Sequence, residues 1–326
     1  MRACATAPGK TILLGEHFVV YGEPAIVVAI DRRAKVMAEV LPGTAFHIAS
    51  DLGISGIFEG EVFKTSSSQE GVRNTLEPVR IAAQSVFDHM GLKRGLNLRI
   101  ESEIPVAVGL GSSSAVSVAT VAAVGRLFDV GLSSEEIFDL SLNAERFVHG
   151  NPSGIDQRVS TFGGILLYRK GERTTEIRCP IDLPLVIANT GKSRSTGALV
   201  ESVRKLWEGH PAVMGQLARA VRGLVDEGVA VLNAGDLKAF GELMHINHGL
   251  LVSAGVSTEA LDRLVHGAKA SGALGAKLTG AGGGGCMVAL CPKHLKMRIA
   301  GAIEECDARA MMTGIDTEGA RKEKDV

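Results

Sequence analysis

Short apolar runs separated by polar turns dominate the first part of the chain. Positions 96–101 alternate apolar and polar residues, a period of two that predicts a half-buried strand. Between 43 and 68, single hydrophobic residues are spaced by Gly and Ser, which favours strands joined by irregular turns. Further strands are expected at other apolar runs, namely 11–14, 18–20, 25–30, 36–41 and 163–168. The first two of these runs flank Gly15-Glu16-His17 and predict strands that meet at a tight turn.

Helical patterns occur in three segments of the same region. Apolar residues recur every three to four positions over 75–90, which predicts an amphipathic helix that ends at the following glycine. Small and aliphatic residues from 115 to 128 form a run of helical length without proline. Ser133-Ser-Glu-Glu136 has the form of a capping box, so a third helix is expected to begin there and to stop before Pro152.

The pattern changes near Cys179-Pro180, where we place a domain boundary. Beyond it, helical spacing prevails, and strands are expected only near 184–190 and 285–290. One helix is expected around 199–207, where apolar residues form a stripe at helical spacing. Further helices are expected at 212–233, 236–252, 258–271 and 293–305. The predicted organisation is a domain of mixed strands and helices at 1–179 and a mostly helical one at 180–326.

Composition narrows the class of protein. The chain has 326 residues, of which 45% are hydrophobic, enough for a sizeable core. A net charge of −1 and an aromatic content of 4% give no electrostatic or stacking case for nucleic acid. The five cysteines are odd in number and scattered, so we interpret them as buried thiols and not as a disulfide framework.

One uncharged segment, 104–125, is long enough to span a bilayer. Pro105, two glycines and three successive serines in its first half argue against a membrane helix. No apolar stretch typical of a signal peptide precedes Lys10. We therefore expect a soluble cytoplasmic protein with no membrane or nucleic-acid partner.

The clearest chemistry lies between the expected strand at 96–101 and the expected helix at 115–128. Gly109 and Gly111 permit backbone conformations and close approaches that a Cβ would prevent. Three serines then open the helix, where free N–H groups and the positive end of the dipole favour a phosphate. The loop lacks the lysine of a P-loop, and Ser114 replaces the third glycine of G-x-G-x-x-G. Taken alone, a phosphate site and a plain turn with a capping serine remain equally open.

Three separated stretches together resemble the motifs of the GHMP small-molecule kinases. Residues 105–115 are similar to the central motif of that family, and residues 7–10 with 15–17 to its N-terminal motif. Residues 277–286 are similar to its C-terminal glycine loop. The resemblance covers nearly the full length. It implies an α+β fold of two domains, the N-terminal one like domain 2 of ribosomal protein S5 and the C-terminal one ferredoxin-like, with the active site in the cleft between them.

Within that family, the chain most resembles the short archaeal enzymes that phosphorylate mevalonate, on the segments 154–164 and 190–196. The resemblance implies ATP-dependent phosphorylation of the primary C5 hydroxyl of mevalonate, in isoprenoid precursor biosynthesis, with Mg²⁺ as cofactor and a homodimer as the assembly. Tyr21 and Gly197 depart from the pattern, where His and Arg are common. The alternatives are another GHMP kinase acting on phosphomevalonate, homoserine or a sugar, or a non-catalytic binding protein on the same fold.

The family pattern also implies roles for individual residues. Asp156 would be the general base toward the alcohol, and Lys10 the cation beside it. Ser113 and Glu145 would hold the Mg²⁺, although Ser112 is not distinguished from Ser113 as the metal-side hydroxyl. The ATP phosphates would lie against Pro105, Gly109, Leu110, Gly111, Ser112, Ser113, Ser114 and Ala115. Contacts with the substrate would come from Glu16, His17, Arg194, Thr196, Gly280, Ala281 and Gly282.

Each of these residues also has an ordinary structural interpretation. Lys10 directly after Pro-Gly and Asp156 two residues after Gly154 are typical of turns, and Glu145 is typical of a solvated helix face. His245 and His248 have metal-ligand spacing on a helix, but no third ligand is evident, which favours helical packing. The presence of all three motifs in order favours catalysis over these interpretations.

Overall fold

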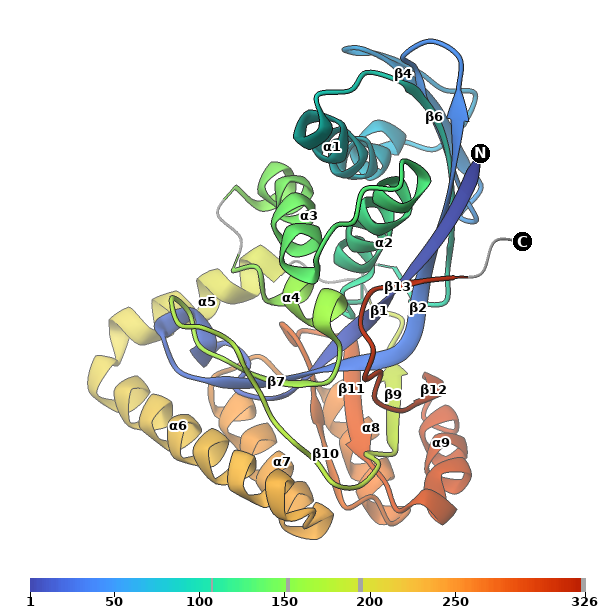
Figure 1. Cartoon of the computed structure of the whole chain (residues 1–326). Helices are drawn as coiled ribbons and strands as arrows, with labels where there is room; N and C mark the ends of the chain where they lie inside the picture. Colours follow the sequence, from blue (N-terminus) through green and yellow to red (C-terminus); the bar gives the residue numbers. More distant parts are fainter. Residues whose placement is uncertain (107, 151–152, 193–195, 324–326) are drawn as a thin grey trace.

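A computed structural model of the chain describes residues 1–106, 108–150, 153–192 and 196–323. Within these residues the strands form two sheets, a nine-stranded sheet that extends to the top of Figure 1 and a four-stranded sheet near its base. Helices pack on both. The predicted α+β class is confirmed.

The larger sheet is built on two long antiparallel strands, β1 (Arg2–Leu14) and β2 (Ala25–Leu41). Its order is β13-β1-β2-β6-β3-β4-β5, and β7 extends it by pairing with β2 and with β8. The other strands are β3 (Phe46–Ser50), β4 (Ile54–Glu59), β5 (Val62–Lys64), β6 (Gly95–Ser102), β7 (Ile165–Tyr168), β8 (Thr175–Glu176) and β13 (Arg321–Lys322).

The runs at 25–30 and 36–41, predicted as separate strands, both belong to β2. The register against β1 shifts between Pro8 and Gly9, which face Arg33 and Ile30 respectively. The two residues of β2 between these partners form a bulge. A bulge lets a strand bend while its pairing continues on either side, so polar residues in mid-strand do not end it.

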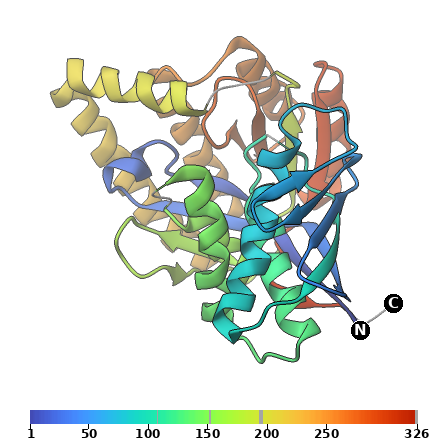
Figure 2. The same ribbon diagram turned by 90° about the horizontal axis from the view of Figure 1, so that it is seen from above.

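Four helices cover one face of this sheet (Figures 1 and 2): α1 (Val72–Met90), α2 (Ser112–Leu127), α3 (Ser134–His149) and α4 (Ile155–Phe162). The central helix, α2, packs against β1, β2 and the other three helices and is buried along most of its length. Its small and branched residues permit this close packing. The predicted capping box of α3 is confirmed, with Ser133 and Glu136 each bonded to the backbone N–H of the other.

The smaller sheet is antiparallel, in the order β10 (Gly275–Leu278), β11 (Cys286–Leu290), β9 (Leu185–Asn189), β12 (Arg309–Thr313). The central strands β9 and β11 are the two that their apolar runs predict. The edge strands β10 and β12 are not predicted, because Lys277 and Arg309 interrupt their apolar character. The predicted helical segments correspond to α5 (Thr196–Gly209), α6 (Pro211–Ala234), α7 (Leu237–Ser253), α8 (Glu259–Ala270) and, after a short 3-10 turn at Lys293–Leu295, α9 (Lys296–Glu304).

The prediction of a strand at 18–20 is wrong. Phe18–Tyr21 is a 3-10 helix, η1, preceded by His17 at φ 62°. The amide of Val19 donates to the carbonyl of Gly15 at 3.1 Å, so the chain coils immediately after β1. Local hydrogen bonds therefore override the apolar run that favoured a strand.

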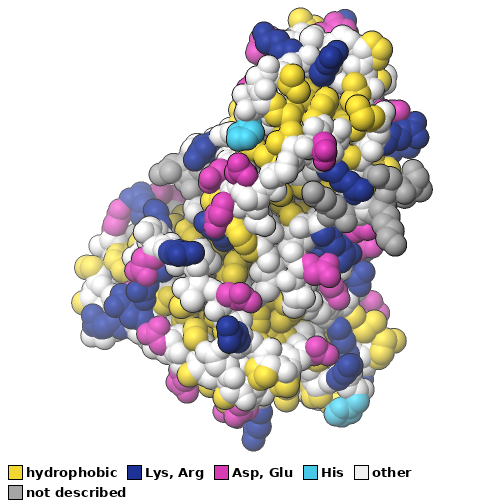
Figure 3. Space-filling model, viewed as in Figure 1, with side chains coloured by type: hydrophobic (Ala, Val, Ile, Leu, Met, Phe, Trp, Pro, Cys, Tyr) yellow, Lys and Arg dark blue, Asp and Glu magenta, His cyan; other side chains and the backbone are white. Residues whose placement is uncertain are grey.

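The chain returns to the larger sheet at its end, where β13 pairs with β1. The domain boundary between residues 179 and 180 stays a prediction. Strand β13 follows this boundary in sequence but belongs to the sheet formed by the strands that precede it. Among the helices the structure describes, none combines the length and the apolar character needed to cross a bilayer. Basic and acidic side chains are interspersed over the face of the molecule shown in Figure 3.

Candidate active site

The glycine loop lies between β6 and α2, as its sequence predicts. Gly109 and Gly111 have φ values of 83° and 75°, in the left-handed region that favours glycine. A Cβ on Gly111 would lie 2.9 Å from Cγ of Lys10, so glycine also allows the loop to approach β1. The loop thus delivers the N-terminus of α2, with its free N–H groups, to the strand that carries Lys10.

Lys10 and Asp156 meet beside this loop. The backbone N–H of Lys10 donates to the carbonyl of Leu110 at 2.8 Å, which fixes the strand against the loop. The ammonium of Lys10 lies 3.1 Å from Oδ1 of Asp156, which stands in the first turn of α4. The Lys10 side chain is 8% exposed and that of Asp156 is 28% exposed. A nearly buried cation is therefore held against a carboxylate that reaches the surface of a cavity.

Glu145, on α3, points to the start of α2. Its Oε2 accepts hydrogen bonds from Nε2 of Gln157 at 2.7 Å and from Oγ of Ser114 at 3.4 Å. Ser112 is half-buried and Ser113 is exposed at the head of the helix, whereas Ser114 is buried. Ser113 and Glu145 line the same cavity, which brings together the hydroxyl and carboxylate oxygens that Mg²⁺ prefers.

These groups line one cavity of about 440 Å³. Its wall includes Asp156, Glu145, Thr196 and Pro105 together with the whole of the loop 109–114. Ala115, the remaining residue predicted at the phosphate site, is buried behind the wall and donates its N–H to the carbonyl of Gly111 at 2.9 Å. The cavity is also lined by residues for which no role was predicted, namely Ser50, Asp51, Leu52, Asn74, Thr75 and Pro78. They lie in the β3–β4 turn and the start of α1, far from the motifs in sequence.

The second glycine loop, between β10 and β11, packs against β1 at the residues that follow Lys10. Oγ1 of Thr279 lies 3.0 Å from Oγ1 of Thr11, directly beside Lys10 in sequence. The imidazole Nε2 of His17 lies 2.9 Å from the carbonyl oxygen of Ala281. Gly280 and Gly282 have φ values of 74°, and a Cβ on Gly282 would lie 2.1 Å from the carbonyl oxygen of Val256. The predicted substrate residues 17 and 280–282 are thus brought together next to the lysine strand.

Known proteins share both halves of this arrangement. Residues 77–164 match the family model of the GHMP kinases N terminal domain, and residues 229–306 match that of GHMP kinases C terminal. A mevalonate kinase of Thermococcus sibiricus is 42% identical, covering 99% of this chain and 99% of its own length. One of Pyrococcus abyssi is also 42% identical, over 98% of this chain and 97% of its own.

The chain belongs to the GHMP kinase family.

Solved GHMP kinase structures agree. The crystal structure of L. major mevalonate kinase in complex with R-mevalonate superposes with a TM-score of 0.83 at 29% identity, covering 96% of this chain and 95% of that one. The Methanococcus jannaschii mevalonate kinase gives a TM-score of 0.85 at 26% identity, covering 97% of this chain and 99% of that one. The two-domain α+β fold implied by the motifs is confirmed, and membership of the family makes this protein an ATP-using kinase.

In this GHMP kinase, Glu16 does not face the cavity. The residue is 1% exposed, and its carboxylate pairs with the ammonium of Lys277 and accepts from Nδ2 of Asn247 at 3.2 Å. Burial raises the pKa of Glu16 and lowers the pKa of Lys277, while contact between the two charges opposes both shifts. Asn247 also accepts the N–H of Gly15 at 3.2 Å. This buried group joins the segment before η1 to β10 and α7.

Sequence reasoning assigned no role to Lys277 or Asn247. The only available signal was a lysine in a short strand of otherwise apolar or small residues, since Asn247 lies on a helix far along the chain. Arg194, predicted as a carboxylate partner, lies outside the described residues, and the neighbouring Thr196 is exposed at the start of α5.

The two helical histidines pack as expected. His245 Nδ1 lies 3.3 Å from the carbonyl oxygen of Ala276, and Nδ1 of His248 accepts from the amide of Leu278 at 3.4 Å. Both contacts attach α7 to β10. Within the described part of the chain, no group of three or more His, Cys, Asp or Glu residues is arranged to hold a metal ion.

Proposed function

We propose that this GHMP kinase transfers the γ-phosphoryl group of ATP to the primary C5 hydroxyl of mevalonate, giving 5-phosphomevalonate and ADP. The observation that carries the proposal is the 3.1 Å pair of Lys10 and Asp156 beside the glycine loop. Relatives that are 42% identical over almost their whole length bear the name mevalonate kinase, which supports the choice of substrate.

Asp156 is the proposed general base. An aspartate is a weak base for an alcohol, so its main work is to orient the hydroxyl and to receive the proton as the bond to phosphorus forms. Lys10 lies beside it and favours negative charge on the attacking oxygen and on the γ-phosphate. Transfer leaves the alcohol oxygen bonded to phosphorus, the proton on Asp156, and ADP as the leaving group.

The loop 109–114 is the proposed cradle of the phosphates. Backbone N–H groups at the start of α2 point where an anion is favoured. The cavity continues from this loop to Asn74 and Pro78 on α1, which leaves room for the nucleoside end of ATP.

Ser113 and Glu145 are the proposed Mg²⁺ ligands. The donor set fits, because Mg²⁺ takes one or two protein oxygens and completes its shell with phosphate and water. Gln157 and Ser114 both donate to Oε2 of Glu145 and so hold its carboxylate toward the phosphate loop. When bound, Mg²⁺ would neutralise charge on the β- and γ-phosphates.

The proposed substrate contacts are His17, Thr196, residues 280–282 and Arg194. Glu16, expected to touch the substrate, is enclosed by Lys277 and Asn247. We therefore assign it the task of orienting the segment 15–17, so that His17 keeps its place against the second glycine loop.

A homodimer and a cytoplasmic location also belong to this proposal. The family resemblance supports the dimer, and light scattering measures it. The five cysteines are free thiols, as is usual in a reducing compartment.

ATP consumption with a panel of acceptors tests the function. The panel holds mevalonate, phosphomevalonate, homoserine and galactose, and the product is identified by ³¹P NMR. We expect the highest kcat/KM with mevalonate and a phosphate monoester at C5. A higher kcat/KM with another acceptor would make that compound the assigned substrate in place of mevalonate. No turnover with any of the four would favour a non-catalytic binding protein.

A further inference from the structure

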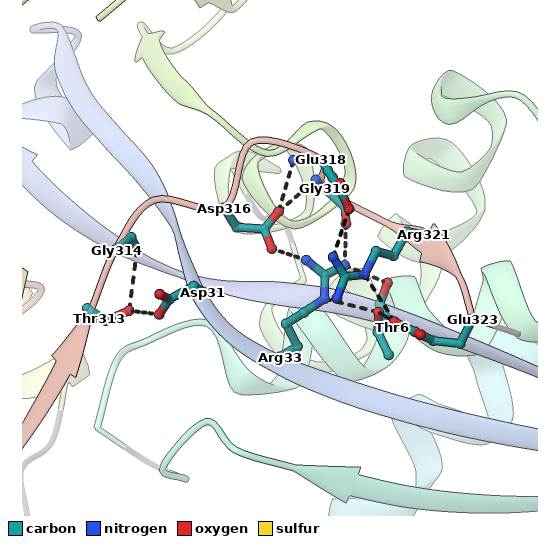
Figure 4. Close-up of polar contacts among 10 residues, drawn as sticks. All are labelled: Thr6, Asp31, Arg33, Thr313, Gly314, Asp316, Glu318, Gly319, Arg321 and Glu323. Carbon is teal, nitrogen blue, oxygen red and sulfur yellow. Dashed lines mark hydrogen bonds and ion pairs between the residues drawn. The ribbon is translucent and has the colours of Figure 1, made fainter. Parts of the chain in front are cut away.

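The segment 314–323, here called the C-terminal strap, leaves β12 and crosses the larger sheet before it ends in β13 (Figure 4). It begins at the bulge of β2. Thr313 donates its hydroxyl to the carboxylate of Asp31, and the amide of Asp31 donates to the carbonyl of Gly314 at 3.2 Å. The strap therefore enters where β1 and β2 change register.

Asp316 is the central side chain of the strap. Its Oδ1 accepts the amides of Glu318 and Gly319 at 3.1 and 2.9 Å, and its Oδ2 pairs with the guanidinium of Arg33. The same guanidinium donates to Oγ1 of Thr6 at 3.0 Å and to its carbonyl at 3.2 Å. The Arg33 and Asp316 side chains are 10% and 7% exposed, so this pair ties the strap to β1 and β2 in a mostly buried setting.

The backbone of Asp316 joins two elements that carry the proposed catalytic pair. Its N–H donates to the carbonyl of Ala29 at 3.0 Å, and its carbonyl accepts the N–H of Gly164 at 2.7 Å. Ala29 in turn donates to the carbonyl of Gly164 at 3.0 Å and stands opposite Lys10 in the β1–β2 register. One residue of the strap thus connects the strand next to Lys10 with the turn that follows α4.

The strap also fixes the end of α4, the helix that begins with Asp156 in its first turn. The amide of Ala320 donates to the carbonyl of Thr161 at 3.0 Å. Gly319, at φ 68°, packs so closely that a Cβ would lie 2.3 Å from the carbonyl oxygen of Thr161. Because α4 has 8 residues, a shift at its end moves the whole helix and Asp156 with it.

We propose that Asp316, acting through Arg33 and the strap, is a positioning residue for the pair of Lys10 and Asp156. The inference rests on the proposed function, because it takes those two residues as the catalytic pair. A displacement of about 1 Å from a distant substitution is enough to reduce turnover by roughly a hundredfold. The glycine loop lies at the other end of α2 from β13, so nucleotide binding stays intact.

Asp316→Asn tests the proposal with little change of shape. The amide oxygen can still accept from the strap backbone, but Arg33 loses its counter-charge. We expect kcat to fall roughly tenfold or more, with KM for ATP and the stoichiometry of nucleotide binding unchanged. Gly319→Ala, which pushes directly on Thr161, gives the same split by a second route. The control is Glu318→Gln, whose exposed side chain pairs with Arg321 at 2.7 Å, and it is expected to match wild type.

Two further measurements separate positioning from general instability. Adding Asp316→Asn to Asp156→Asn is expected to cause a smaller further loss of kcat than Asp316→Asn causes in the wild type, because part of its effect acts through Asp156. A full additional loss, or normal kcat in Asp316→Asn, would overturn the inference.

Amide exchange over 156–163 gives a readout that does not depend on the acceptor. We expect faster exchange there in Asp316→Asn than in Glu318→Gln, and equal exchange would overturn the inference. If the wild-type protein fails to phosphorylate mevalonate, the proposed function fails, and the exchange result still decides the role of the strap.

Discussion

The glycine loop 109–114 packs against Lys10 of β1, and the buried Glu16–Lys277 pair lies just beyond the end of that strand, yet the chain specifies the two in different ways. The loop is one contiguous stretch whose glycines and serines show their purpose in sequence. The buried pair joins residues from the two ends of the chain and is completed by Asn247. Local chemistry thus marks the proposed phosphate site, while long-range packing holds the segment of the proposed substrate contacts in place.

Lys277→Met removes the cation of the buried Glu16–Lys277 pair and is expected to have the largest effect, which is on stability. It leaves the carboxylate of Glu16 buried without its cation, which destabilises a protein by about 3–5 kcal/mol. Urea denaturation measures the free energy of unfolding. The matched control is the double variant Glu16→Leu with Lys277→Met, expected to recover most of the loss because no charge stays buried. Equal loss in both variants would show that the pair itself is not the cause.

Asp156→Asn changes the carboxylate beside the glycine loop 109–114. The expected effect is on the reaction rate and not on stability. Turnover should fall roughly a hundredfold or more, since the amide cannot receive the proton of the alcohol. Nucleotide binding, followed by fluorescence or calorimetry, should stay near normal. Asp182→Asn, at an exposed aspartate paired with Lys293, serves as the control. Near-normal turnover in Asp156→Asn would remove the base assignment.

Glu145→Gln tests the same cavity and distinguishes metal binding from phosphate binding. The concentration of Mg²⁺ for half-maximal rate should rise roughly tenfold or more, because a charged ligand is lost. A Mg²⁺ titration at saturating ATP measures it. Asp139→Asn, at an exposed position of the same helix, should titrate like wild type. An unchanged titration in Glu145→Gln would contradict the ligand role.

The smallest expected effect is a pH dependence of stability, caused by a histidine of α7 near the buried Glu16–Lys277 pair. Burial lowers the pKa of His248 below its ordinary value of 6.5, and the nearby charge of Lys277 adds to the shift, although Asp262 opposes it. The folded state therefore binds fewer protons than the unfolded chain as pH falls through 6.5, so stability decreases on acidification.

Urea midpoints measured from about pH 7 to about pH 5 test this expectation. His248→Asn keeps an acceptor for the amide of Leu278 but cannot titrate, and it should flatten part of the decrease. The exposed His294→Asn should not. Identical pH slopes in wild type and His248→Asn would exclude this histidine as a source.

The same contrast explains how much the sequence could predict. Strands and helices with a clear period, such as 96–101 and 75–90, were predicted with nearly correct bounds. The run at 18–20 was misread because hydrogen bonds to Gly15 coil the chain, and β10 was missed because its lysine is buried only through Glu16. A partner on a distant helix leaves no local pattern.

Within the site, the motifs brought Asp156, Glu145 and the loop to one cavity, with Lys10 paired to Asp156 beside it. The wall formed by Asp51 and Asn74 had no sequence signal, because these residues come from a turn and a helix start of ordinary composition. The enclosure of Glu16 was equally invisible, since a carboxylate within a motif suggests contact with substrate until its buried partners are known.

The pairing of β13 with β1 bears on how the enzyme is made. Strand β1 leaves the ribosome early, but its edge at Ala5 and Thr6 gains a strand partner only when residues 321–322 have been translated, after every other strand of the sheet. During synthesis that edge offers unpaired N–H and C=O groups to neighbouring nascent chains, a known route to aggregation. Nascent chains on one polysome therefore expose this strand edge to one another. We expect chaperone binding to be greatest just before the ribosome translates β13.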